Sequence, residues 1–235
     1  MPTKKKPELI NWYETIPKKY LLKTHNPHYD THRIKLPMRL IIAGNSGSGK
    51  TQTLLNLIYN MPETFEKIFI VTKNKDEPLY NYLEDKFKQH GGLTIKEGIH
   101  ELPDLDKLDK TQNNLVVLDD LCNESAKAQK PIADFFIRCR KKNCSIIYIS
   151  QSFYQVPKLI RDNINYLIIK QVSSMKNLTM ICRECSLGID KKKLKEIYDD
   201  ATANKTDFLL IDLEGDKNER FRKNLDSVYE IEDIM

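Results

Sequence analysis

Long apolar runs are absent from this chain of 235 residues. No run approaches the roughly 20 residues that a membrane-spanning helix needs, so we expect no transmembrane segment. The basic start, residues 1–6, is not followed by an apolar segment, so we expect no secretory signal either. With 40% hydrophobic and 30% charged residues, the composition is that of an ordinary soluble protein and not of a disordered one.

Cysteine is sparse, odd in number and scattered, with five residues in the chain. This usage predicts a reducing compartment. The C-x-x-C pair Cys182 and Cys185 has no second pair and no histidine at zinc-finger spacing, so small buried side chains explain the cysteines better than a metal site does. The formal net charge of +5 is compatible with a nucleic-acid partner but does not establish one.

Glycine is also scarce, yet three of the 8 glycines fall within six positions, 44 to 49. They belong to a G-x-x-x-x-G-K-T pattern that follows an apolar strand and precedes a helical pattern, as a phosphate-binding loop requires. The glycines allow a tight turn whose N–H groups meet phosphate oxygens, and the N-terminus of the helix favours the same anion. In such a loop Lys50 can reach the β- and γ-phosphates, and the Thr51 hydroxyl can ligate Mg²⁺. We therefore predict a nucleotide site made of Gly44, Asn45, Ser46, Gly47, Ser48, Gly49, Lys50, Thr51 and Gln52.

An acidic pair ends the second informative stretch, the apolar run 115–118 followed by Asp119 and Asp120. In this fold class the end of such a strand lies beside the phosphate loop. We expect Asp119 to hold Mg²⁺ and Asp120 to orient or deprotonate the attacking water. Gln151 ends a later buried strand, and there it can sense the γ-phosphate or hold the water; the alternative is an ordinary polar residue at a strand exit.

Apolar strands alternate with helical patterns along most of the chain, which predicts an α/β fold of the P-loop NTPase class with a mostly parallel central sheet flanked by helices. We expect one helix near 79–87 with Tyr82 on its apolar face, another over 131–142, and a terminal hairpin over 208–222. We divide the chain into an N-terminal arm (1–36) that packs on its own core or on a neighbouring subunit, an ATPase domain (37–225) and an acidic tail (226–235).

Three blocks of sequence carry a resemblance to a known family. The blocks are the phosphate loop, the 115–120 stretch and, above all, residues 136–163, which read Phe136-Ile-Arg-Cys-Arg140-Lys-Lys-Asn143, Ile146-Ile-Tyr-Ile-Ser-Gln151 and Pro157-Lys-Leu-Ile-Arg161-Asp-Asn163. Over about residues 38 to 170 the chain resembles the genome-packaging ATPases of the FtsK/HerA superfamily, the poxvirus-type packaging ATPases. The arm and the C-terminal third add little to this resemblance.

The resemblance implies a homo-oligomeric ring, a pentamer or hexamer, that uses ATP and Mg²⁺ to thread double-stranded DNA into a preformed capsid. It also implies a capsid vertex or portal partner, a place in the host-cell cytoplasm (viral factory) or in the virion, and an arginine supplied across the subunit interface. Arg140 stands where the family has this arginine, although a lysine follows it here in place of histidine; Arg138 and Arg161 are the other candidates. Asp120 stands where much of the superfamily has glutamate.

Two other functions fit the phosphate loop. A small nucleotide or nucleoside kinase shares the loop and the chain length, but explains Asp120 and Gln151 less well. An ATP-binding assembly or switch factor with little turnover suits the N-terminal arm with its aromatic residues. Phosphate transfer to a nucleoside distinguishes the first, and nucleotide binding without turnover distinguishes the second.

Overall fold

The computed structural model describes residues 9–172, 174–185 and 187–231. The start of the predicted arm (1–8) and the end of the predicted acidic tail (232–235) lie outside the described residues. Within the described ranges, no helix has the length and apolar character that crossing a bilayer requires.

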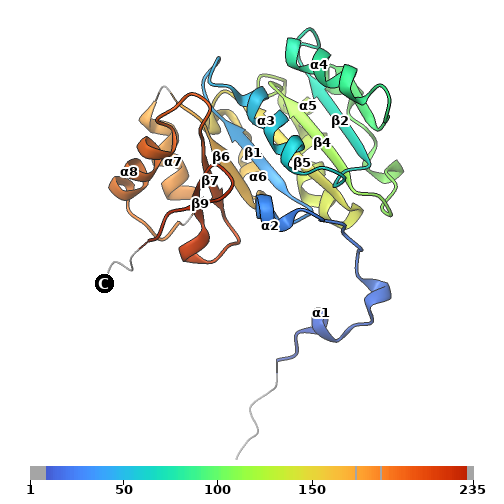
Figure 1. Cartoon of the computed structure of the whole chain (residues 1–235), viewed down its shortest axis with the longest axis horizontal. Coiled ribbons are helices and arrows are strands. Elements are labelled where there is room, and N and C mark those ends of the chain that lie inside the picture. The colour runs from blue at the N-terminus through green and yellow to red at the C-terminus, as the bar shows by residue number, and fades with distance from the viewer. Residues whose placement is uncertain (1–8, 173, 186, 232–235) are drawn as a thin grey trace, which may run out of the picture.

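A single mixed sheet forms the centre of the fold, with strands in the order β3-β2-β4-β5-β1-β6-β7-β8-β9 (Figure 1). The first six strands in this order pair in parallel, and β6 to β9 pair antiparallel. The predicted α/β class and the terminal hairpin are confirmed. The strands are β1 (Arg39–Ala43), β2 (Lys67–Thr72), β3 (Leu93–Glu97), β4 (Asn114–Asp119), β5 (Cys144–Ser150), β6 (Tyr166–Ile169), β7 (Leu209–Asp212), β8 (Phe221–Lys223) and β9 (Ser227–Val228).

Helices cover both faces of this sheet. The α-helices are α1 (Trp12–Thr15), α2 (Tyr29–His32), α3 (Lys50–Asn60), α4 (Pro78–Phe87), α5 (Ala126–Arg138), α6 (Lys158–Arg161), α7 (Met175–Glu184) and α8 (Lys191–Ala201). The 3-10 helices are η1 (Lys18–Tyr20), η2 (Ile99–Glu101), η3 (Leu105–Lys107), η4 (Cys139–Lys142), η5 (Phe153–Gln155) and η6 (Lys217–Glu219). Buried residues of α3 and α4 pack on one face, and those of α5 to α8 pack on the other.

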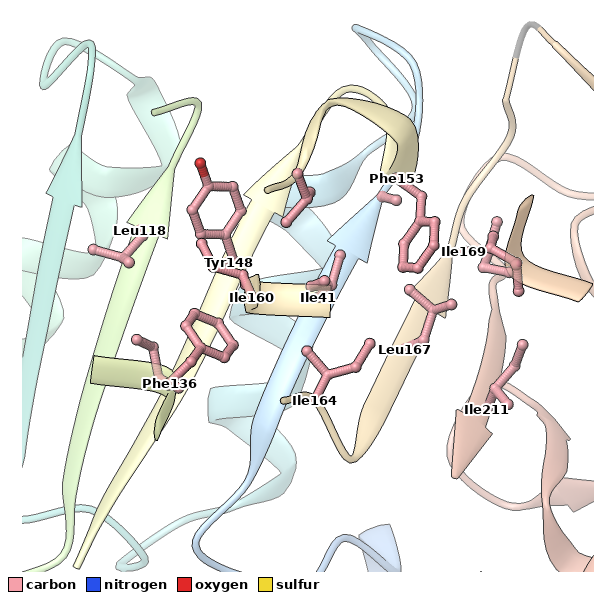
Figure 2. Close-up of a cluster of buried hydrophobic side chains, with 14 of the residues drawn as sticks. Ile41, Leu118, Phe136, Tyr148, Phe153, Ile160, Ile164, Leu167, Ile169 and Ile211 are labelled. Atoms are coloured by element: carbon pink, nitrogen blue, oxygen red, sulfur yellow. The ribbon is translucent and has the colours of Figure 1, made fainter. Parts of the chain in front are cut away.

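The short strand β1 shows why the sheet is buried on both faces. Ile41 and Ala43 face the core layer under α5 to α8, while Leu40 and Ile42 face the layer under α3 and α4, and all four side chains are fully buried. Alternation of apolar side chains to both faces is what a central parallel strand requires. Figure 2 shows Ile41 within the first layer, where helices α5 and α6 contribute Phe136 and Ile160. Burial of each such side chain stabilises the fold by roughly 1.5–3 kcal/mol.

Two helix predictions are wrong in detail. The helix expected over 131–142 begins five residues earlier, at Ala126, because Ser125 caps it by accepting a 3.3 Å hydrogen bond from the Ala128 N–H. Pro131 therefore lies inside the helix, and residues 139–142 form the 3-10 turn η4. In α4 the sequence pattern placed Tyr82 on the apolar face, but Tyr82 is 55% exposed.

The described part of the N-terminal arm divides into two regions. His32 and Ile34 are fully buried, and the chain near His25 lies against the domain, since its carbonyl accepts a hydrogen bond from Asn113. Trp12 and Tyr13 are 66% and 77% exposed, and α1 lies away from the domain in Figure 1. The later half of the arm thus belongs to the folded body, while Trp12 and Tyr13 in its first half are largely exposed.

Candidate nucleotide-binding and catalytic site

Four neighbouring parallel strands end at one edge of the sheet. Ala43, the last residue of β1, is in register with Ser150 of β5 on one side and Ile169 of β6 on the other. Asp119, the last residue of β4, is in register with Ile149 of β5. The residues that follow these strands therefore share one edge, and this is where open α/β sheets bind ligands.

The phosphate loop connects β1 to α3 at this edge. Gly47 and Gly49 have φ angles of +71° and +85°, which residues with a Cβ adopt only with strain. Gly44 is needed for another reason, because a Cβ there would lie 2.5 Å from Cβ of Lys170. Gly49 precedes α3 without a side-chain cap, so the first N–H groups of an 11-residue helix stay available to an anion.

Lys50 is the first residue of α3, and its side chain contacts the phosphate loop. Its ammonium donates a 2.9 Å hydrogen bond to the Asn45 carbonyl. Burial lowers the pKa of Lys50, and the negative charges of Asp119 and Asp120 oppose that fall. The three charged side chains therefore lie close enough to influence one another, at the sheet edge that carries the phosphate loop.

Asp119 is half-buried at the end of β4, and burial raises the pKa of its carboxyl group. The Tyr80 hydroxyl donates a 2.7 Å hydrogen bond to Oδ2 of Asp119, which lowers this pKa, as does the nearby Lys50 ammonium. A buried carboxylate whose charge is disfavoured by desolvation gains from any cation that binds beside it.

Asp120 follows directly and has a φ of +56°, in the left-handed region. Aspartate and asparagine adopt this conformation far more readily than longer side chains do. Gln151 lies across from it, with Nε2 donating to Oδ1 and Oδ2 of Asp120 at 3.3 and 3.5 Å. Two polar side chains from neighbouring strand ends thus meet at the edge of the sheet that carries the phosphate loop.

The three candidate arginines lie in different surroundings. Arg138 donates two hydrogen bonds to the carboxylate of Asp106, at 2.7 and 2.9 Å. Arg161 makes a similar double contact with Glu184, and its side chain is only 9% exposed. Arg140 is exposed and makes no side-chain hydrogen bond or ion pair with any described residue. It lies in η4, just before β5, and hence at the opposite edge of the sheet from the phosphate loop.

Two residues beside the site carried no functional signal in the sequence. Tyr80 donates a hydrogen bond to Asp119, but it was not on the helical face that we expected to be buried. Lys170 follows β6, is 1% exposed, and has a pKa that burial lowers to about 8. Its ammonium donates to three carbonyl oxygens of the 205–207 segment. The one sequence feature that could have drawn attention to Lys170 is its place directly after a buried strand.

The donor set fits a magnesium-bound triphosphate. The loop offers backbone N–H groups and one ammonium to phosphate oxygens, and the hydroxyl of Thr51 and the carboxylate of Asp119 are the oxygen ligands that Mg²⁺ prefers. The buried Ser48 hydroxyl lacks a hydrogen-bond partner among the described residues, so this loop has donor capacity that its own fold does not use.

Comparison with known proteins identifies sequence relatives. A family model described as Poxvirus A32 protein matches residues 28–220. The DNA packaging protein OPG160 of Variola virus is 28% identical over 159 residues, covering 60% of this chain and 55% of that protein. OPG160 of Vaccinia virus (strain Copenhagen) is 28% identical over 150 residues, with the same coverage. The chain spans about half the length of these curated relatives.

Solved structures share the fold at low sequence identity. The genome packaging NTPase B204 from Sulfolobus turreted icosahedral virus 2, in complex with sulfate, superposes with a TM-score of 0.61 at 12% identity, over 84% of this chain and 100% of that one. The same protein in complex with ATP-gammaS gives a TM-score of 0.57 at 11% identity, over 83% and 100% of the two chains. These likenesses confirm the predicted P-loop NTPase fold.

Proposed function

Since this chain belongs to the Poxvirus A32 protein family, we propose that it is an ATPase that drives double-stranded DNA into a preformed viral capsid. The observation that carries the proposal is the meeting of Lys50, Asp119, Asp120 and Gln151 at the sheet edge that holds the phosphate loop. Together with the N–H groups of the phosphate loop and the Thr51 hydroxyl, this set supplies the groups that nucleotide hydrolysis needs from one subunit.

Each residue has a defined task in the proposed reaction. The N–H groups of residues 44–52 and the Lys50 ammonium bind the phosphates. Thr51 and Asp119 would hold Mg²⁺, and the ion would neutralise phosphate charge. Asp120 accepts the proton of the attacking water, and Gln151 orients Asp120 and that water.

An arginine from a neighbouring subunit completes the proposed site. Arg138 and Arg161 are held in ion pairs within their own chain, which favours Arg140 as the one available. Its place at the opposite sheet edge keeps it from its own phosphate loop, so it acts on the nucleotide of the next subunit in a ring. Such an arginine accelerates phosphoryl transfer by roughly 10³–10⁵.

The partners follow from the same proposal. Double-stranded DNA passes through the ring, a pentamer or hexamer, and basic side chains contact its phosphates without reading sequence. Lys142 and Lys158 pair with Asp106 and Asp162, whereas Lys141 and residues 191–193 make no ion pair within the described chain and are better placed to contact DNA. A capsid vertex or portal component receives the ring, in the host cytoplasm (viral factory) or the virion.

The division of the chain is part of the proposal. Residues 37–225 form most of the ATPase domain, to which the fold adds the buried residues His32 and Ile34 and the strand β9, Ser227–Val228, from the start of the predicted acidic tail. The part of the arm around Trp12 and Tyr13 packs against a neighbouring subunit through these exposed aromatic side chains, which favours ring assembly.

The test is ATP hydrolysis by the purified, assembled protein with and without duplex DNA. We expect DNA to stimulate hydrolysis, and we expect Lys50→Ala to lower the rate by about 100-fold or more because the ammonium no longer stabilises phosphate charge. Equal rates with and without DNA, together with failure to form rings, would contradict a motor. Phosphate transfer to a nucleoside would indicate a kinase, and binding without turnover would indicate an assembly switch.

A further inference from the structure

A loop from the C-terminal part of the chain, residues 202–207, lies beside the phosphate loop. It joins α8 to β7 and is held by Lys170, whose buried ammonium donates to the carbonyls of Lys205, Thr206 and Asp207 at 2.8, 3.0 and 2.8 Å. The neighbouring Gln171 side chain donates to the Thr202 carbonyl at 3.2 Å. The loop is therefore fixed to the end of β6 at both of its ends.

The same two residues after β6 also contact the phosphate loop. Cβ of Lys170 lies 2.5 Å from the point where a Cβ on Gly44 would stand, and the Gln171 carbonyl accepts a 2.8 Å hydrogen bond from the Asn45 N–H. The Lys205 carbonyl oxygen lies 3.7 Å from the point where a Cβ on Gly49 would stand. The 202–207 loop thus borders the start of α3.

The order of the strands decides which part of a nucleotide this loop faces. Asp119 ends β4 and Gln151 follows β5, both on one side of β1, and in the proposed function these residues mark where the terminal phosphate reacts. A nucleotide is an elongated molecule, so its nucleoside end leaves the phosphate loop on the other side of β1. That side is formed by β6 and β7 and by the loop that Lys170 holds.

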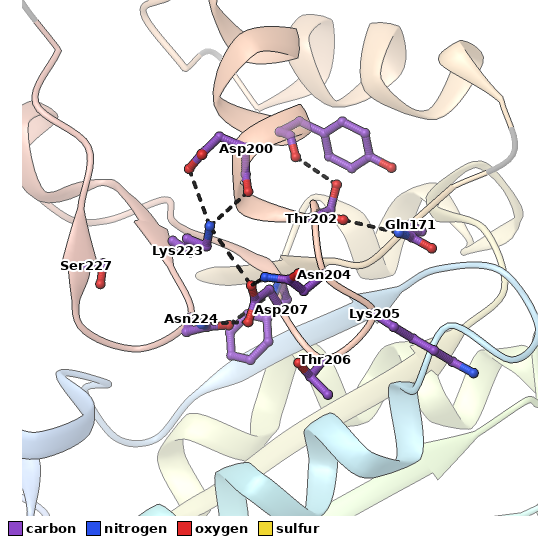
Figure 3. A network of polar contacts seen from close by, with 12 residues as sticks. Gln171, Asp200, Thr202, Asn204, Lys205, Thr206, Asp207, Lys223, Asn224 and Ser227 are labelled. Atoms are coloured by element: carbon purple, nitrogen blue, oxygen red, sulfur yellow. Dashed lines mark hydrogen bonds and ion pairs between the residues drawn. The ribbon is translucent and has the colours of Figure 1, made fainter.

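The 202–207 loop carries one cationic side chain, Lys205, that takes no part in the polar contacts around it. Asp207 is paired with Asn204 at 2.9 Å and Asn224 at 3.2 Å, and Lys223 contacts Asp200 at 3.6 Å. The Lys205 side chain is exposed and makes no hydrogen bond or ion pair with the described residues. Figure 3 shows it extending away from the paired side chains of the network.

We propose that the 202–207 loop forms the nucleoside side of the nucleotide site, with the Lys205 ammonium donating hydrogen bonds to the ribose oxygens. This inference rests on the proposed nucleotide-dependent function. It differs from the phosphate contacts of residues 44–52 because it concerns the part of the ligand that carries no phosphate. It also explains the role of the buried Lys170, which fixes the 202–207 loop against the phosphate loop.

The test compares two ligands that differ only by the adenosine group, ADP and pyrophosphate. Dissociation constants are measured by titration calorimetry, with pyrophosphate followed by its displacement of ADP. We expect Lys205→Ala to weaken ADP binding by about three- to tenfold, the value of a hydrogen bond or two, and to leave pyrophosphate binding unchanged. Lys205→Arg retains a donor and should bind ADP nearly as well as the wild type.

Lys217→Ala is the matched control. Lys217 is exposed in η6, which follows β7 at the opposite edge of the sheet, so its replacement removes the same charge far from the site. Unchanged ADP binding by Lys205→Ala, or an equal loss of ADP and pyrophosphate binding, would overturn the inference. Wild-type protein that binds neither ligand would instead contradict the proposed function.

Discussion

Tyr80 of α4 donates a hydrogen bond of 2.7 Å to Oδ2 of Asp119 at the end of β4. Tyr80 is 1% exposed, so this contact lies under the surface of the site and not on it. The tyrosine fixes the orientation of a carboxylate that we propose as a Mg²⁺ ligand. It also offsets part of the rise in the Asp119 pKa that burial causes.

The first prediction concerns this contact. Tyr80→Phe removes only the hydroxyl group, and partners of metal ligands typically change metal affinity or activity by about 10–100-fold. We expect the Mg²⁺ concentration for half-maximal ATP hydrolysis to rise by about tenfold, measured at fixed ATP. The control is Tyr82→Phe, because Tyr82 lies on the same helix and is 55% exposed. Equal Mg²⁺ requirements for the two variants would show that Tyr80 serves packing alone.

The central residues of the proposed site can be named from the sequence because their chemistry is local. A phosphate loop needs glycines and Lys50 within a few positions, and parallel strands carry Asp119 and Gln151 to one edge whatever the connecting segments do. Tyr80 was missed because its partner is 39 positions away, and only the packing of α4 brings the two together. Lys170 was missed for the same reason, since its three acceptors lie 35 to 37 positions later.

The second prediction concerns Asp120. Asp120→Asn removes the proposed base and should lower the rate of ATP hydrolysis by about 100-fold or more while ATP binding is kept. Asp120→Glu restores a carboxylate, but the φ of +56° disfavours the longer side chain, so we expect no recovery of rate. Steady-state hydrolysis and ATP titration calorimetry measure the two effects. A fully active Asp120→Glu would mean that the left-handed backbone does not restrict this position.

The third prediction concerns the pH dependence of stability. His32 is fully buried, its Nδ1 accepts a 3.0 Å hydrogen bond from the Ile34 N–H, and its pKa falls from 6.5 to about 4, chiefly because of burial. The unfolded chain therefore binds a proton before the folded one does, so stability falls as the pH drops from 6.5 towards 4. The loss attributable to His32 is about 2 kcal/mol between pH 7 and pH 5.

Urea unfolding of the wild type and His32→Asn at these two pH values measures that loss. Asparagine keeps an acceptor for the Ile34 N–H but does not titrate, so the variant should lose about 2 kcal/mol less than the wild type on acidification. His100→Asn is the control, because its side chain is 76% exposed. The interpretation fails when both variants respond to pH as the wild type does.

The last prediction concerns Arg140, whose exposed side chain is the candidate for a contact between subunits. Arg140→Ala should lower DNA-stimulated hydrolysis by about 1,000-fold, because a positive charge beside the terminal phosphoryl group is lost in the transition state.

Mixing Arg140→Ala with Asp120→Asn subunits provides the sharper result. The Arg140→Ala subunit keeps an intact phosphate loop and acid pair, and the Asp120→Asn subunit keeps Arg140. Where the two meet in the right order, one complete site forms, so activity should return on mixing. Arg138→Ala is the control, since Arg138 is held by Asp106 and should change stability more than rate. If Arg140→Ala hydrolyses ATP at the wild-type rate, Arg140 is not part of the site. If the mixed subunits stay inactive, Arg140 acts on the nucleotide of its own subunit or takes no part in the reaction.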